Sequence, residues 1–330
     1  MPTIDPSVVS AAVAAVERAA LATTAAQGRL AVGDTLTKDD ASPVTVADFA
    51  AQAGVCRTLA DLRGDVAVVG EEHPDDLADQ PALLAGVGEL ARLGLGVDSF
   101  DAAAVVDAVG IGAAPATPGG TYWTLDPIDG TKGFVRGDQY AIALALIEDG
   151  EVVLGVLGCP NLPNPDGSTG AILVGVDGAA TIQAIGAGAD GVAKTPIRVD
   201  DPATVAASRF CESVESGHSD QGQSAEIAGL LGIATEPYRI DSQCKYAAVA
   251  RGDASIYLRL PTRADYEEKI WDHAAGKFVV ECAGGVVTDV HGQPLDFSRG
   301  GRLRAGGGVI ATSGRFHADV VAAVSTVLSS

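Results

Sequence analysis

The sequence predicts an α/β protein in which helices and mixed β-sheets are stacked in layers. Segments with helical periodicity alternate along the chain with β-branched and aromatic segments, which is typical of layered α/β folds. Apolar runs at 140–147 and 152–157 flank a short acidic segment that contains Asp-Gly, a strong β-hairpin signal that excludes a purely parallel sheet. The chain has 330 residues and 47% hydrophobic content, which is enough to bury a large core.

The first half of the chain begins with two expected helices, at 6–27 and 45–62. A short buried strand, 66–69, then runs directly into Gly-Glu-Glu. Residues 74–120 are rich in Asp, Ala, Gly and Leu with weak periodicity, so we expect a helix with loops that forms a lid, an edge cover or plain surface. The β-branched and aromatic content of 121–125 predicts a strand that ends at Asp126.

A Pro-, Asn- and Gly-rich stretch at 160–169 is expected to link two subdomains, an N-terminal α+β unit (1–160) and a C-terminal α/β unit (161–330). The second unit mixes strands and helices, without a repeat of solenoid period. The expected strands lie near 171–176, 207–210, 254–260, 285–289 and 307–312. The expected helices lie near 222–231, 271–282 and 314–327.

The composition predicts a cytoplasmic protein with an acidic surface. No run of about 18 apolar residues occurs, and residues 1–5 lack the basic patch of a secretory signal. Five cysteines without a CxxC pair indicate reduced thiols rather than a zinc site. The net charge of −21 fits high solubility or a saline host, and it should repel nucleic acid polymers and anionic membranes. We therefore expect neither as a partner, and a polyanionic substrate would need cations concentrated at one site.

Four acidic clusters fall where expected helices or strands begin or end. They are Asp48 at a helix start, Glu71-Glu72 after a strand, Asp126 with Asp129 after another strand, and Asp272 in the segment WDHAAG. Taken singly, each is more often a plain turn or a solvated strand end. If they converge, their carboxylates would repel one another and would protonate unless a cation neutralised them. Hard oxygen ligands suit Mg²⁺, so the clusters together predict a magnesium site.

The segment 126–131, DPIDGT, is central to this hypothesis. Proline fixes one φ angle and Gly130 allows a tight turn, so both carboxylates and the Ile128 carbonyl can be directed into one volume. Two metal ions about 3.5–4 Å apart at such a site would hold a phosphate and activate a water. The Thr131 hydroxyl could orient that water while donating to Asp48, the expected proton acceptor. The alternative for Thr131 is a turn-stabilising role.

These motifs, in this order, resemble the inositol monophosphatase superfamily. The resemblance rests on SPVTVAD at 42–48, GEE at 70–72, DPIDGT at 126–131 and WDHAAG at 271–276. It implies a five-layer αβαβα sandwich of the inositol monophosphatase and fructose-1,6-bisphosphatase type. It also implies a Mg²⁺-dependent, lithium-sensitive phosphatase.

Other segments are similar to one branch of that superfamily, the 3′(2′),5′-bisphosphate nucleotidases. They are KGF at 132–134, CESVESGHS at 211–219, DSQCKY at 241–246, YLRLP at 257–261 and YEEKI at 266–270. This resemblance implies hydrolysis of adenosine 3′,5′-bisphosphate to AMP and phosphate, with 3′-phosphoadenylyl sulfate as a second substrate. The alternatives are an inositol phosphate phosphatase or a fructose-1,6-bisphosphatase of the same superfamily, or a catalytically idle nucleotide-binding protein.

The resemblance also implies roles for individual residues. Two or three Mg²⁺ ions would be held by Glu71, Asp126, the Ile128 carbonyl, Asp129 and Asp272. Asp48 and Thr131 would activate the attacking water. The nucleotide and its 5′-phosphate would be bound by His218, Ser242, Lys245 and Arg259.

Two points in this assignment stay open. Arg251 and Arg263 lie near Arg259 in the sequence and are alternatives to it. Asp220, close to His218, departs from the pattern of the branch, and an acid there could retune base recognition. The branch further implies a monomer that binds a small nucleotide.

Overall fold

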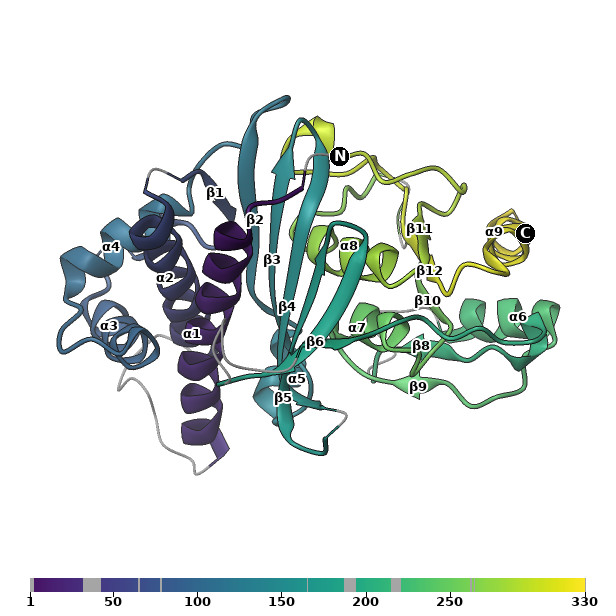
Figure 1. The fold of residues 1–330 in the computed structure, drawn as a ribbon, viewed down its shortest axis with the longest axis horizontal. Coiled ribbons are helices and arrows are strands. Elements are labelled where there is room, and N and C mark those ends of the chain that lie inside the picture. The colour runs from purple at the N-terminus through teal and green to yellow at the C-terminus, as the bar shows by residue number, and fades with distance from the viewer. Residues whose placement is uncertain are drawn as a thin grey trace.

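The computed structural model describes residues 3–31, 43–64, 66–77, 79–164, 166–186, 194–214, 221–261, 263 and 265–329. Five layers run from left to right in Figure 1, in the order helices, sheet, helices, sheet, helices. This arrangement confirms the predicted αβαβα sandwich.

The first layer contains four helices that cover one face of the larger sheet. They are α1 (Pro6–Ala31), α2 (Pro43–Arg63), α3 (Pro81–Leu95) and α4 (Ala102–Ile111). Small side chains let α1 and α2 pack closely on each other and on the sheet, and α3 and α4 close over α2. The segment 74–120 is therefore part of this layer, with a 3-10 turn, η1 (Pro74–Leu77), ahead of its two helices.

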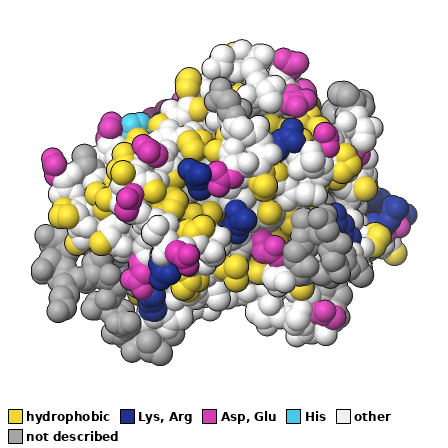
Figure 2. Space-filling model, turned by 60° about the vertical axis from the view of Figure 1, so that its left-hand side comes forward, with side chains coloured by type: hydrophobic (Ala, Val, Ile, Leu, Met, Phe, Trp, Pro, Cys, Tyr) yellow, Lys and Arg dark blue, Asp and Glu magenta, His cyan; other side chains and the backbone are white. Residues whose placement is uncertain are grey.

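Helix α1 is apolar and long enough to cross a membrane, and it is the one described helix with this property. Half of its apolar window is nevertheless buried inside the protein. Figure 2 shows the molecule from the side of this helical layer. Over the described part of that face, basic side chains lie scattered among acidic and hydrophobic ones rather than gathered in a patch.

The second layer is a seven-stranded sheet whose strands follow one another in chain order. They are β1 (Val68–Gly70), β2 (Thr121–Asp129), β3 (Ala141–Glu148), β4 (Glu151–Pro163), β5 (Thr169–Val176), β6 (Ala179–Ala184) and β7 (Thr195–Pro196). Only the β1–β2 pair is parallel among these pairings. The expected hairpin is confirmed as β3 and β4. The expectation that β2 ends at Asp126 was wrong, because β2 continues to Asp129 with a register shift between these two residues.

The Pro-, Asn- and Gly-rich stretch at 160–169 is not a linker. It connects β4 to β5, and the two strands pair antiparallel with Cys159 opposite Ala171. The sheet therefore runs on past residue 160 as far as β7. The division into 1–160 and 161–330 stays a prediction.

The remaining three layers come from the second half of the chain. The short helix α5 (Thr131–Arg136) lies beside the first sheet. The middle layer holds α7 (Cys244–Ala250) and α8 (Ala274–Cys282), which pack between the two sheets. The second sheet has the strand order β11-β12-β10-β8-β9. Its strands are β8 (Phe210–Glu212), β9 (Tyr238–Arg239), β10 (Ile256–Arg259), β11 (Val286–Thr288) and β12 (Val309–Thr312).

Helices α6 (Gln221–Leu231) and α9 (His317–Leu328) cover the outer face of the second sheet, over a separate apolar cluster. Two 3-10 turns, η2 (Val205–Ala207) and η3 (Phe297–Arg299), complete the described elements. The strand expected near 207–210 lies slightly later, as β8, because η2 occupies the residues before it. Helices α5 and α7 were not expected from the sequence, since each is too short to show helical periodicity.

Candidate active site

A cleft of about 500 Å³ lies where the first sheet faces α7 and the second sheet. Its walls come from the end of β2, the start of α5, the first turn of α7, strand β10 and the segment before α8. The sequence-predicted residues that line it are Glu71, Asp126, Ile128, Asp129, Thr131, Ser242, Lys245, Arg259 and Asp272. Glu71 and Asp272, which are far apart in the chain, thus meet in one cavity.

The parallel pairing of β1 with β2 explains why Glu71 and Asp126 are neighbours. Gly70 stands opposite Leu125 in the register, and the Glu71 N–H donates to the Leu125 carbonyl at 3.2 Å. Glu71 and Asp126, which come next after this pair of residues, therefore lie at the same edge of the sheet. Helix α2 holds this edge, because the Gln52 amide bonds the backbone N–H and carbonyl of Glu72, at 3.0 and 2.6 Å.

The turn after β2 requires a glycine. Gly130 has a φ of 90°, which L side chains rarely adopt, and a Cβ there would lie 2.6 Å from the Ser242 Cβ. Ser242 itself has a φ of 64°, a strained value for serine. The two unusual backbones meet, and this contact brings the start of α7 against the DPIDGT segment.

The acidic side of the cleft holds more negative charge than the protein neutralises. Asp126 is 3% exposed, and its Oδ1 has no hydrogen-bond partner. Burial, followed by the carboxylates of Glu71 and Asp129, raises the pKa of Asp126 well above its usual range. Burial also raises the pKa of Glu71, although a hydrogen bond with Asp126 opposes that rise. Two carboxyl groups that bond each other need either a shared proton or a cation.

Asp129 and Asp272 extend the acidic group across the cleft. Burial, and then the charge of Asp272, raises the pKa of Asp129, while Lys245 opposes the rise. Burial likewise raises the pKa of Asp272. A cluster of carboxylates around the buried Asp126, with an unpartnered oxygen on Asp126 and an adjacent carbonyl at Ile128, has the donor chemistry that Mg²⁺ prefers. The residues present therefore fit a divalent cation.

Asp48 lies beside this group without lining the cleft. It is 7% exposed, and burial, then the charges of Glu72 and Glu71, raise its pKa well above the usual range. Burial, and then the charge of Glu71, also raise the pKa of Glu72, to about 7. Thr131 is exposed at the cleft, and no hydrogen bond joins it to Asp48 among the described contacts. Their joint role in activating a water stays a prediction.

The opposite side of the cleft is cationic. Lys245 is 7% exposed, burial lowers its pKa, and its Nζ lies 5.4 Å from the centre of the Tyr257 ring. Arg259 also faces the cleft. The two alternative arginines lie outside the cleft: Arg251 pairs with Asp253 at 2.9 Å, and Arg263 pairs with Asp265 at the surface. Lys245 and Arg259 can therefore receive an anion opposite the carboxylates.

Two of the expected residues lie outside the described part of the chain, namely His218 and Asp220. Ser242 lines the cleft, and its Oγ accepts from the Cys244 N–H at 3.1 Å. Tyr246, the last residue of the segment DSQCKY, is fully buried.

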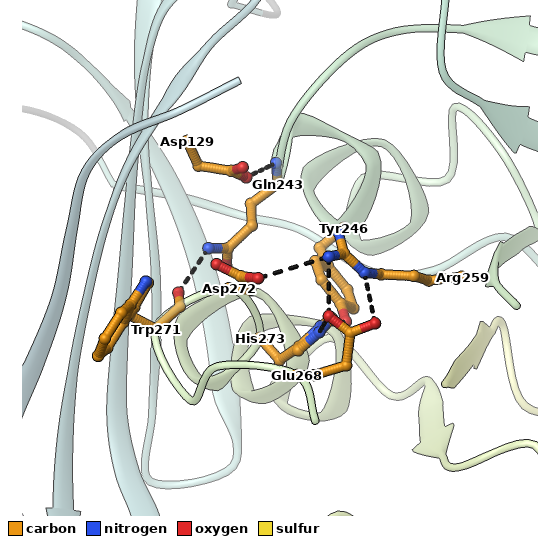
Figure 3. Close-up of polar contacts among 8 residues, drawn as sticks. All are labelled: Asp129, Gln243, Tyr246, Arg259, Glu268, Trp271, Asp272 and His273. Carbon is orange, nitrogen blue, oxygen red and sulfur yellow. Dashed lines mark hydrogen bonds and ion pairs between the residues drawn. The ribbon is translucent and has the colours of Figure 1, made fainter. Parts of the chain in front are cut away.

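Sequence reasoning gave no role to Gln243, which joins the two parts of the acidic group. Its backbone N–H donates to Asp129, and its side-chain Nε2 donates to the Trp271 carbonyl at 2.8 Å. Its Oε1 accepts from the Gly276 N–H at 3.1 Å. Figure 3 shows this residue between Asp129 and the segment that carries Asp272. The only signal in the sequence was its position between two expected binding residues.

Glu268 was also missed. It pairs with Arg259 and lies four residues before Asp272, and together with His273 these two acids form a tight group of potential metal ligands. The Arg259 guanidinium already contacts Glu268 and repels a second cation, so this group is a poor metal site. An acid shortly before the Asp272 motif was the available signal.

Comparisons with known proteins show the family to which this chain belongs. The sequence model of the inositol monophosphatase family matches residues 5–329. A 3′(2′),5′-bisphosphate nucleotidase from Emericella nidulans is 42% identical, over 95% of this chain and 96% of its own length. The protein with the same name from Schizosaccharomyces pombe is 43% identical, over 96% and 95%.

Solved structures share the fold at low sequence identity. The extragenic suppressor protein suhB from Bartonella henselae gives a TM-score of 0.61 at 18% identity, covering 96% of this chain and 99% of its own. CysQ from Bacteroides thetaiotaomicron, described as a bacterial member of the inositol monophosphatase family, gives 0.60 at 20% identity, covering 92% and 96%.

Proposed function

Since the chain belongs to the inositol monophosphatase family, we propose that it is a 3′(2′),5′-bisphosphate nucleotidase. It hydrolyses adenosine 3′,5′-bisphosphate to AMP and phosphate, and 3′-phosphoadenylyl sulfate is a second substrate. The observation that carries this function is one cleft in which a cluster of carboxylates around the buried Asp126 faces Lys245 and Arg259. A substrate with two separate anionic groups matches such a cleft, because one group is held on each side.

The family's enzymes depend on metal ions, and the acidic group here suits Mg²⁺. Two or three ions would be held by Glu71, Asp126, the Ile128 carbonyl, Asp129 and Asp272. Bound Mg²⁺ supplies charge neutralisation for the scissile phosphate and Lewis-acid activation of the water.

The protein's own groups bind the substrate and move protons. Lys245 and Arg259 receive the 5′-phosphate, which leaves the 3′-phosphate against the carboxylates. Thr131 orients the attacking water, and Asp48, whose raised pKa suits a base, accepts its proton. The new P–O bond forms as the bond to the ribose 3′-oxygen breaks, and that oxygen takes up a proton from solvent and becomes the 3′-hydroxyl of AMP. Ser242 and His218 contact the nucleotide in this proposal.

The test is a substrate panel assayed with Mg²⁺, with EDTA and with lithium. We expect phosphate release from adenosine 3′,5′-bisphosphate that requires Mg²⁺ and is inhibited by lithium. The alternative is an inositol phosphate phosphatase, and higher kcat/KM on inositol 1-phosphate than on the bisphosphate would establish it. Fructose 1,6-bisphosphate completes the panel.

The proposed ligands are tested by Asp129→Asn, which should abolish turnover while circular dichroism shows an intact fold. Wild-type rates in this variant would remove Asp129 from the metal site. We further propose a cytoplasmic monomer that acts on small nucleotides and binds neither nucleic acid polymers nor membranes. Sedimentation of the purified protein tests the oligomeric state.

A further inference from the structure

The Arg259 side chain is held by one hydrogen bond and one ion-pair contact with the two oxygens of Glu268. Its Nε donates to Glu268 Oε1 at 2.9 Å, and its Nη2 lies 2.7 Å from Oε2. The same Nη2 lies 3.5 Å from Asp272 Oδ2. Figure 3 shows the guanidinium between the two acids, with Glu268 below it. Contacts with both oxygens of one carboxylate fix both the place and the plane of a guanidinium.

Glu268 is itself firmly placed. It is 5% exposed, and although burial alone would raise its pKa, His273 and Arg259 lower it to about 2. The His273 Nε2 lies 3.4 Å from Glu268 Oε2, and its Nδ1 is 2.8 Å from the Tyr246 hydroxyl. Both Tyr246 and His273 are fully buried. A chain of buried side chains thus supports the carboxylate from behind.

The contact with Glu268 occupies one edge of the guanidinium. Nε and Nη2 face acids, whereas Nη1 has no hydrogen bond among the described contacts. The Arg259 side chain is 34% exposed and lines the cleft, so its remaining donors can meet a ligand there. Without Glu268, the nearest charge for Arg259 would be Asp272, on the acidic side.

We propose that Glu268 is a positioning residue that fixes the Arg259 guanidinium at the wall of the cleft, so that the donors it leaves free face the anion-binding side. Glu268 does not line the cleft, so it acts on the substrate only through Arg259. This inference rests on the proposed function, because it assigns the second phosphate of the substrate to Arg259. It makes Glu268 a determinant of bisphosphate binding rather than of the hydrolytic step.

The test compares Glu268→Gln with the wild type at saturating Mg²⁺. We expect KM for adenosine 3′,5′-bisphosphate to rise about tenfold with kcat within about twofold, because a charge-assisted contact to the substrate loses its alignment. Glu281→Gln is the matched control, since Glu281 also pairs with a cation, Lys277, at 2.8 Å but lies outside the cleft. It should keep wild-type KM and kcat.

A double-mutant cycle shows whether Glu268 acts through Arg259. In an Arg259→Lys background, Glu268→Gln should raise KM no further. Independent, multiplying effects would overturn the proposal, as would an unchanged KM in the single variant or a loss confined to kcat. Calorimetric titration with AMP, which carries only the 5′-phosphate, should show about tenfold weaker binding to Glu268→Gln than to the wild type. This measurement does not depend on turnover.

If Glu268→Gln does not fold, Glu268→Asp serves instead. It keeps the charge but is one methylene shorter, so it cannot reach both Nε and Nη2, and KM should rise about threefold. An unchanged KM in that variant would refute the positioning role. Failure of the proposed function would look different, because the wild type itself would then release no phosphate from the bisphosphate.

Discussion

Replacing Asp126 with asparagine should stabilise the metal-free protein, although it should abolish activity. Asp126 is 3% exposed, has an unpartnered Oδ1 and lies among other carboxylates that raise its pKa. An asparagine amide is neutral and can donate to Glu71 without taking up a proton. A buried polar group without its partner costs about 1–3 kcal/mol, so relief of part of this cost should add about 1–2 kcal/mol to the free energy of unfolding.

The assay is thermal unfolding of both proteins in EDTA and in Mg²⁺. In EDTA, Asp126→Asn should melt about 1–3 °C above the wild type. Saturating Mg²⁺ should stabilise the wild type by about 2.7 kcal/mol at a hundredfold excess over Kd, and the variant by much less. The difference between the two melting temperatures should therefore shrink, or change sign, when Mg²⁺ is added.

The control is Asp107→Asn, which makes the same charge change at an exposed position on α4. Its melting temperature should follow the wild type in both buffers. If Asp126→Asn melted below the wild type in EDTA, repulsion between the carboxylates would not destabilise the metal-free protein. If it kept the full Mg²⁺ stabilisation, Asp126 would not be a ligand.

Three further changes test other parts of the structure. Burial lowers the pKa of His317, whose ring nitrogens form hydrogen bonds with the Thr288 and Thr312 hydroxyls at 2.9 Å each. The unfolded chain therefore takes up the proton more readily, and the free energy of unfolding should fall as the pH drops below about 6.5. Urea midpoints measured between pH 5 and 8 would check this, and His317→Gln should make the midpoint less dependent on pH. Gly276→Ala should cost about 1–3 kcal/mol by calorimetry, because its Cβ would lie 2.3 Å from the Tyr246 ring, and an unchanged melting temperature would contradict the packing. Lys245→Met should raise the melting temperature, because burial disfavours the charged form of Lys245. The same variant should raise KM for the bisphosphate at least tenfold, because it removes a cation that binds the phosphate. Equal KM values for the variant and the wild type would exclude Lys245 from substrate binding.

The acidic side of the site could be predicted because its signal is local. Asp126, Ile128 and Asp129 lie within four consecutive residues, and their residue types alone suggest a cation site. Glu71 and Asp272 follow from their motifs and from the order of those motifs along the chain. The structure places all five at the same cleft.

The supporting contacts could not be predicted, since they depend on partners distant in the chain. Gln243 joins Asp129 to Trp271, and the sequence gives no indication that these segments are neighbours. The extension of β2 to Asp129 was missed because proline usually ends a strand, whereas here the ladder accommodates it through a register shift. The stretch at 160–169 has the composition of a linker and forms a hairpin connection instead, because composition does not reveal strand pairing.

The two sides of the cleft belong to different halves of the architecture. Glu71 follows β1, and Asp126 and Asp129 lie in the last part of β2, both strands of the first sheet, whereas Lys245 and Arg259 come from α7 and β10. Evolution could therefore exchange the basic half and acquire a new specificity while inheriting the hydrolytic half unaltered. An engineer who wishes to redirect the enzyme should diversify α7 and β10 and leave the edge of the first sheet alone.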